Sequence, residues 1–555
     1  MAALVAPVIA AATLLAACGS GGSSGGLNGN TQIGKNDINP VDVSKLKTGG
    51  DFRWGLDQLP DNWNYNEVDG TLLDASYMIN AIEPRTFIAD AKNNVNANPD
   101  YLSSASLVST DPEVIDYKIN PKAKWSNGRP INWEDFQAQA NALSGKNTAY
   151  QIASDTGYAN ISKVEKGAND QEVKVTFGKK FAEWKSLFTP LYPKELNSDP
   201  NTFNSGWAKA PKITAGPFKV GSIDQTAQAV TLVPDPNWWG QKPKLAKLEF
   251  KVISRDALAD SMANNTIDYY NIGSSVDLFK RAQANKDVTI RESPIPQSLV
   301  IDFNGKPSSI LQDQKLRVAI QQGIDTTAIG KALFGPMIKD PSSLQLGNHF
   351  YWRGQPQYKD NSGPVKFNQD AAKKALDADG WKLSGQYRKK NGKELDITFI
   401  KDNPNPISDN ITKLVQSQLA QIGVKVNIKP VPIADFFKSY VFRGDYDMTG
   451  YAWQGTSYPV SGNTGVFYLD PKNPQQNYSQ VGNQTINKLL DQANSELDDQ
   501  KRADLANQID AEVYKTGHLL NIAQYPGACA VRKTVANFGA WGFADIDYTK
   551  IGFTQ

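Results

Sequence analysis

The sequence predicts an α/β body divided into at least two lobes. Strand-like and helix-like segments alternate along most of the chain, and no repeat of 20–50 residues indicates a solenoid. The chain has 555 residues, whereas a single core rarely grows beyond about 250–300 residues. Hydrophobic residues make up 40% and charged residues 21%, which is ordinary for a soluble globular protein.

Three segments alternate apolar and polar residues, as half-buried strands do: 173–177, 248–253 and 424–431. Helical spacing marks three others. The Ala-rich segment 371–380 ends in Gly380, which suits a C-cap. The segment 410–422 is followed by Gly423 and a strand, and 486–513 has a long helical pattern with one weak break.

The first residues predict secretion. The run 2–17 is apolar but shorter than the roughly 20 residues of a membrane span. It fits a signal peptide over 1–17. Leu15 to Cys18, followed by a Gly/Ser tract, resembles the bacterial lipobox, which implies a lipidated Cys18. No Lys or Arg precedes the run, so a start upstream of Met1 and a frayed N-terminal helix both stay open.

Residues 18–46 are rich in Gly, Ser and Asn and lack apolar periodicity. A flexible coil of this length spans about 30 Å, which suits a tether. No later run reaches the length of a membrane span. We therefore expect an extracytoplasmic body held at the cell membrane by a lipid on Cys18.

Charge and residue counts argue against several classes of protein. The net charge is +2, which gives no electrostatic case for nucleic acid. The chain has two Cys (Cys18, Cys529) and two His (His349, His518), which argues against a zinc, iron–sulfur or redox site. We expect no metal and no cofactor, and we expect Cys529, in an apolar stretch, to be a buried inert thiol.

An enzyme is the first competing class. The motifs G-x-S-x-G, H-E-x-x-H and C-x-x-C do not occur, and 145–148 lacks the upstream Gly of a P-loop. Carboxylate pairs stay open, because 57 acidic residues guarantee chance neighbours. The absence of these motifs predicts a protein that performs no chemistry.

The most specific segment, 124–136, reads Lys-Trp-Ser-Asn-Gly-Arg-Pro-Ile-Asn-Trp-Glu-Asp-Phe. Asn127 and Gly128 suit a tight turn. Asn132 suits a helix N-cap, and Glu134 and Asp135 suit that helix's first turn. The adjacent carboxylates therefore indicate a fold signature rather than a catalytic site.

This segment resembles the oligopeptide/dipeptide-binding family, family 5, of ABC transporter solute-binding proteins. The family pattern there is K-W-x-D/N-G-x-P-(V/I/L)-T-A-E-D-(V/F). Further matches follow in the family's order, and together they cover about 49–553: 214–220, 235–244, 265–268, 302–304, 316–320, 323–325, 444–447 and Trp453. Two departures are Thr214-Ala215 for Gly-Thr and Asp235 for Asn.

The resemblance implies a two-lobed periplasmic-binding-protein-like fold of type II, with an extra subdomain and a ligand cleft between the lobes. Lobe 1 would cover 47–327, with the subdomain at about 76–208. Lobe 2 would cover 328–525, and 526–555 would return to lobe 1. Such a protein closes about its hinge on a ligand and delivers it to an ABC permease. We expect a monomer.

Peptide-binding members add the ligand as a strand between the lobes. The resemblance implies ligand contacts from the strand that carries Phe303 and Asn304, called the F-N strand, and from the loop after the strand at 444–447. The case for the first strand, 52–57, is weaker. For Trp453, core packing is an equal alternative. The candidate residues are Phe303, Asn304, Tyr451, Trp453, Gln454, Thr456, Ser457, Trp54 and Asp57.

One departure bears on the ligand. Many peptide-binding members carry an Asp three residues after the loop Trp, where it pairs with the peptide's α-ammonium, and here that position is Thr456. Thr456 leaves three alternatives. Another carboxylate of the protein meets the ammonium charge, the ligands are capped or longer peptides, or the ligand is a neutral solute such as an oligosaccharide. Two His make nickel or haem less favoured. A signalling or adhesion lipoprotein without transport is a further alternative.

Overall fold

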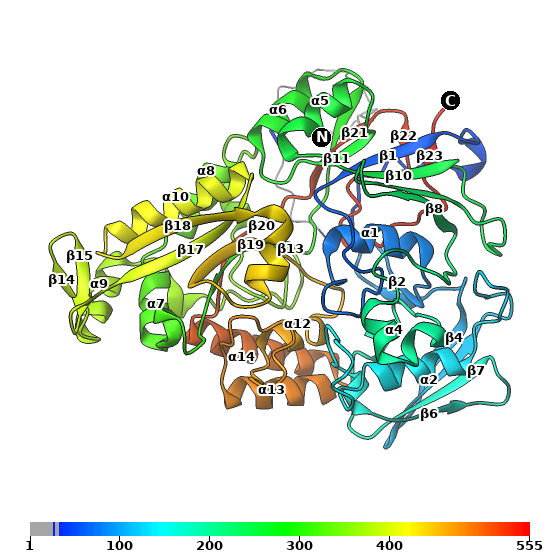
Figure 1. The fold of residues 1–555 in the computed structure, drawn as a ribbon, viewed down its shortest axis with the longest axis horizontal. Helices are drawn as coiled ribbons and strands as arrows, with labels where there is room; N and C mark the ends of the chain where they lie inside the picture. Colours follow the sequence, from blue (N-terminus) through cyan, green and yellow to red (C-terminus); the bar gives the residue numbers. More distant parts are fainter. Residues whose placement is uncertain (1–25, 28–32) are drawn as a thin grey trace, which may run out of the picture.

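A computed structural model describes residues 26–27 and 33–555. The predicted signal peptide and the predicted lipid site at Cys18 lie outside these residues. Two large sheets form two lobes that lie side by side, and a smaller sheet lies below the first lobe (Figure 1). The α/β, two-lobed prediction is confirmed. Within the described residues, no helix is long and apolar enough to cross a membrane.

The sheet of lobe 1 has seven strands in the order β12-β21-β11-β1-β10-β9-β8. Its centre is β1, whose residues alternate between half-buried and buried and which pairs in parallel with β10. The strands are β1 Asp51–Leu56, β8 Phe218–Asp224, β9 Ala229–Pro234, β10 Lys247–Val252, β11 Tyr269–Asn271, β12 Val288–Glu292 and β21 Ala528–Arg532.

The sheet of lobe 2 has five strands in the order β18-β17-β19-β13-β20. Helix α10 packs on β17 and β18, and α8 packs against β20. Every residue of β13 is buried, because this strand has a neighbour on each side and helices over it. The strands are β13 Gln297–Phe303, β17 Asp396–Asn403, β18 Lys425–Pro432, β19 Met448–Gln454 and β20 Leu519–Gln524.

Two short segments carry the chain between these sheets. Residues 293–296 join β12 to β13, and residues 525–527 join β20 to β21. The expected lobe boundary at 327 is therefore too late in the chain. The strand that ends in Phe303, β13, pairs with β19 and β20 and so belongs to the sheet of lobe 2.

The smaller sheet, in the order β4-β5-β7-β6, forms the subdomain with helix α2. The predicted start of α2 is confirmed: the Asn132 side chain accepts from the Glu134 N–H, and Asp135 completes a capping box. The predicted turn is also confirmed, since the Gly128 N–H donates to the Trp125 carbonyl. The strands are β4 Leu102–Thr110, β5 Glu113–Ile119, β6 Ile161–Lys166 and β7 Glu172–Phe177.

The predicted helices form where their spacing places them. The break in 486–513 falls between α13 and α14, where the Asp498 side chain accepts from the Lys501 N–H and begins the second helix. The longer helices are α1 Leu73–Ile82, α2 Trp133–Ala142, α6 Val276–Ala284, α7 Gln314–Gln322, α8 Thr326–Phe334, α9 Gln369–Ala378, α10 Pro406–Ala420, α12 Ser461–Phe467, α13 Gln484–Ser495 and α14 Asp499–Thr516. Short helices and strands complete the fold: α3 Lys194–Asn197, α4 Pro200–Ser205, α5 Leu258–Ala263, α11 Ile433–Asp435, β2 Phe87–Ala89, β3 Val95–Ala97, β14 Lys382–Ser384, β15 Tyr387–Lys390, β16 Lys393–Glu394, β22 Val535–Ala536 and β23 Gly552–Phe553.

Gly527 lies where the two connecting segments touch. Its φ is +66°, and a Cβ added there would lie 1.8 Å from the Ser293 carbonyl oxygen. Gly527→Ala should therefore lower the free energy of unfolding by about 1–3 kcal/mol, as strained backbone positions do. The matched control is Gly330→Ala in α8, where an added Cβ meets nothing within 4 Å. Urea unfolding of both variants would decide, and equal midpoints would contradict the prediction.

Candidate ligand-binding site

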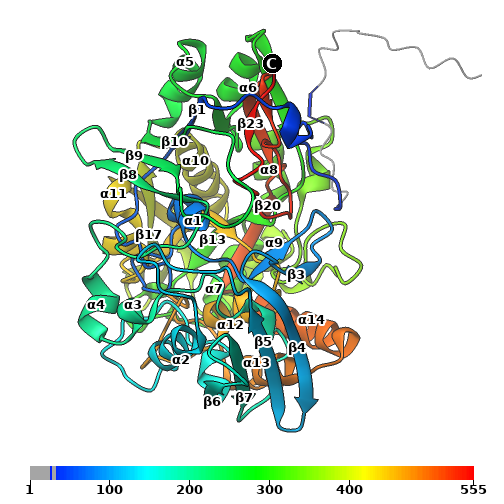
Figure 2. The ribbon, with the colours of Figure 1, turned by 90° about the vertical axis from the view of Figure 1, so that its right-hand side faces the viewer.

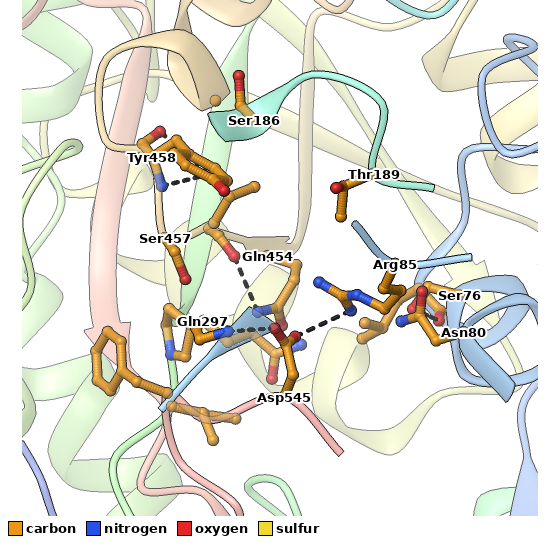
Figure 3. Close-up of a pocket in the computed structure, with 18 of the residues that line it drawn as sticks. Ser76, Asn80, Arg85, Ser186, Thr189, Gln297, Gln454, Ser457, Tyr458 and Asp545 are labelled. Carbon is orange, nitrogen blue, oxygen red and sulfur yellow. Dashed lines mark hydrogen bonds and ion pairs between the residues drawn. The ribbon is translucent and has the colours of Figure 1, made fainter. Parts of the chain in front are cut away.

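A cavity of about 460 Å³ lies between the lobes, within the usual range of small-ligand sites. Helix α1 and residues 85–89 of lobe 1 form one wall, and residues 453–458 of lobe 2 face them (Figure 3). Residues 539–546, near the C-terminus, close a third side.

Four of the predicted ligand residues line this cavity: Trp453, Gln454, Thr456 and Ser457. They are there because β19 pairs with β13, with Trp453 opposite Ser298, and the chain then leaves the sheet at its edge. Trp453 is half-buried, and its ring lies 6.2 Å from that of Tyr451. The Thr456 hydroxyl accepts from the Tyr458 N–H at 3.1 Å, so it stabilises a local turn. That these four contact a ligand stays a prediction.

Strand β13 reaches the cavity only at its first residue, Gln297, so its far end at Phe303 and Asn304 does not, which corrects the expected position of two residues. Phe303 has no exposed surface and belongs to the apolar core. Asn304 is also buried, and its Nδ2 donates to the Gly444 carbonyl at 3.0 Å. Its Oδ1 accepts from the Lys306 N–H at 2.9 Å. The amide thus satisfies the backbone at the end of a central strand.

Tyr451 is likewise absent from the cavity wall, because its hydroxyl donates to the buried Asp302 carboxylate at 3.1 Å. Trp54 lies one layer behind the wall: its ring is 4.6 Å from that of Tyr77 and 5.0 Å from that of Tyr269, and both tyrosines line the cavity. Asp57 forms an ion pair with Arg255 at 2.6 Å, away from the lining.

None of the lobe 1 wall was predicted. Its polar members come from α1, from the ends of β11 and from loops. The segment 539–545, Gly-Ala-Trp-Gly-Phe-Ala-Asp, offered one signal, since two aromatics among glycines fit no regular element. The unpredicted polar and aromatic residues include Tyr65, Asn66, Ser76, Tyr77, Asn80, Arg85, Thr189, Tyr269, Asn271, Gln297, Tyr458, Trp541, Phe543 and Asp545.

Only two of the described residues that line the cavity are charged, Arg85 and Asp545, and they pair with each other. Arg85 Nη1 lies 2.9 Å from Asp545 Oδ1, and the Ala89 N–H donates to Asp545 Oδ2 at 2.7 Å. The lining therefore has no net charge. Its aromatic rings and uncharged donors and acceptors suit a ligand rich in amide or hydroxyl groups.

The subdomain touches lobe 2 at the rim of the cavity. Glu183, beside Trp184, is buried, and its carboxylate accepts from the Ser461 N–H at 2.7 Å and from the Ser461 hydroxyl at 2.6 Å. The Tyr458 hydroxyl donates to the Lys185 carbonyl at 2.6 Å. Figure 2 shows α13 and α14 beside the subdomain sheet, and the Ala182 N–H donates to the Asn494 carbonyl of α13 at 2.7 Å. These contacts hold the lobes together over the cavity.

The two histidines, which are candidates for acid–base chemistry, have structural partners. His349 Nδ1 lies 2.7 Å from Asp510, and His518 Nε2 lies 2.6 Å from the Ser479 hydroxyl. Burial raises the pKa of Cys529 to about 12, as expected for an inert thiol. In the described part of the chain, no three His, Cys, Asp or Glu side chains gather as a metal site.

Known proteins resemble the chain over most of its length. Residues 96–475 match the profile of bacterial extracellular solute-binding proteins, family 5. The oligopeptide-binding protein OppA of Mycobacterium tuberculosis is 37% identical over 522 residues, which are 94% of this chain and 87% of that protein.

Two solved structures share the fold. The periplasmic EDTA-binding protein EppA has a TM-score of 0.82 at 24% identity, over 95% of this chain and 100% of that one. The oligopeptide-binding protein AppA of Bacillus subtilis, in complex with a nonapeptide, has a TM-score of 0.80 at 20% identity, over 92% of this chain and 100% of that one. The profile match over residues 96–475 and the 37% identity over most of the chain show that it belongs to family 5 of the bacterial extracellular solute-binding proteins.

Proposed function

We propose that the chain is the substrate-capturing receptor of an ABC importer and that its substrate is a peptide. It binds by closing its lobes on the ligand, then delivers the ligand unchanged to the permease. The observation that carries this proposal is the cavity itself, which is lined from both lobes by uncharged polar and aromatic side chains. Amides such as Gln297 and Gln454 can both donate to and accept from a peptide backbone.

Identification of the ligand tests this function directly. The protein would be purified under native conditions, denatured, and its released ligands identified by mass spectrometry. We expect peptides at near-stoichiometric yield. After hours with fresh peptide, the recovered peptide should be intact, because the proposed role has no chemical step. An oligosaccharide in the released fraction would replace peptide as the substrate class, and steady cleavage by homogeneous protein would overturn the binding-only role.

We further propose that Cys18 carries a lipid that holds the protein at the membrane, and the support is the sequence Leu15 to Cys18 followed by Gly and Ser. Cys18→Ala should release the protein into the soluble fraction or leave it unprocessed. Fractionation and the mass of the N-terminal peptide would show this. The control is Cys529→Ala, which alters the other, buried cysteine. Unchanged membrane association and N-terminal mass in Cys18→Ala would refute the anchor.

A further inference from the structure

One guanidinium in the cavity wall has an unused hydrogen-bond donor. Arg85 follows α1 and lies beside Ser76 and Asn80 (Figure 3), with 24% of its side chain exposed. Its ion pair with Asp545 uses Nη1. Its Nε is buried and has no hydrogen-bond partner among the residues that the structure describes.

Other arginines of this chain use the corresponding nitrogen. Arg129 Nε and Nη2 hold Glu195 at 3.0 and 2.8 Å, while its Nη1 and Nη2 hold Asp135. Arg53 holds Asp268 through the same Nε and Nη2 edge, at 2.9 and 2.8 Å. A guanidinium in this chain can therefore bind two carboxylates at once, one on each edge, as its fixed fork of donors allows.

In contrast, each oxygen of Asp545 already has a partner, since one pairs with Arg85 and the other accepts from the Ala89 N–H. Among the described residues of the wall, the guanidinium thus has a donor without a partner, whereas both oxygens of the one carboxylate have partners. Thr456, at the position where the family resemblance expects an Asp, is uncharged and is used in a local turn. The polarity of the wall favours a ligand carboxylate over a ligand ammonium.

We propose that Arg85 is the charge anchor of the site and binds a carboxylate of the peptide through the guanidinium donors that Asp545 leaves free, with Asp545 fixing the guanidinium from the other side. This inference rests on the proposed peptide function. The carboxylate comes from the peptide C-terminus or from an acidic side chain, and both present the same two oxygens. Ser76 and Asn80 are positioned to orient the bound group.

The probe is a synthetic library of tetra- to hexapeptides built from uncharged residues, in three matched forms: free termini, N-acetylated and C-amidated. A fourth, amidated set carries one Glu, and its control carries Gln. Captured peptides are quantified by mass spectrometry. We expect amidation to reduce capture at least tenfold unless a Glu restores it, and acetylation to reduce it by less than tenfold.

Arg85→Met, which keeps the apolar stem of the side chain without its donors, should capture free and amidated peptides alike. Arg85→Lys should keep part of the preference, and so should Asp545→Asn, which weakens the contact that fixes the guanidinium. Thermal melting confirms folding of each variant. Equal capture of free and amidated peptides by the unaltered protein, with no effect of Glu, would overturn the anchor, as would a preference that survives in Arg85→Met. Capture of no peptide in any form would overturn the peptide function and the anchor with it.

Discussion

Glu183→Ala should weaken ligand binding by about 2–5 kcal/mol, the usual cost of truncating one partner of a buried hydrogen-bonded charge. The carboxylate joins the subdomain to lobe 2 through Val460 and Ser461, and Arg502 Nε lies 3.8 Å away. Without the Glu183 carboxylate, closure of the lobes buries the Ser461 N–H and the Arg502 guanidinium without the hydrogen bond and the negative charge that now offset their loss of water. The loss should appear as faster ligand dissociation, because closure retains the ligand.

The matched control is Glu195→Ala. Glu195 lies in the same part of the chain and is 38% exposed in its side chain, and it pairs with Arg129 rather than with lobe 2. Its removal should leave dissociation unchanged, because exposed ion pairs contribute about 0–1 kcal/mol. Stopped-flow dissociation and thermal melting of both variants provide the measurement. A Glu183→Ala protein with the original dissociation rate would show that this contact does not hold the lobes closed.

The same contact predicts a pH dependence. Burial raises the pKa of Glu183 above its usual 4.5, although the hydrogen bonds from Ser461 oppose the shift. The closed form therefore takes up a proton more readily than the open form, where the carboxylate meets water. Closure through this contact is favoured in acid and weakens as pH rises through the raised pKa. The dissociation rate should rise with pH relative to that of Glu183→Gln, which does not titrate there.

Trp453→Ala should cost about 2–4 kcal/mol of binding, as truncation of a central aromatic anchor does. The indole is half-buried at the end of β19, lines the cavity and is backed by Tyr451. Unfolding should change much less than binding, because part of the ring faces the cavity rather than the core. Titration calorimetry with a captured peptide would measure the loss, and Trp453→Phe should recover part of it. An equal loss in binding and in unfolding free energy would favour core packing instead.

The local elements of this protein were predictable from its sequence. The α2 cap at Asn132, the turn at Gly128 and the break before α14 depend on the chemistry of neighbouring residues. The strands β7, β10 and β18 follow from alternation over a few positions. Such features need no knowledge of what lies across the fold, because periodicity and capping act within one or two turns of chain.

The site was predictable only where it follows directly from an element, as with the loop from Trp453 to Ser457 at the end of β19. The family resemblance led to Phe303 and Asn304, yet a central strand with neighbours on both sides buries them. Arg85 and Asp545 come from distant parts of the chain and meet only because the C-terminal segment returns to lobe 1. The sequence alone determined which segments are strands, helices and turns. The tertiary structure decided which side chains face the cavity, because that depends on sheet order and on contacts between residues far apart in the chain.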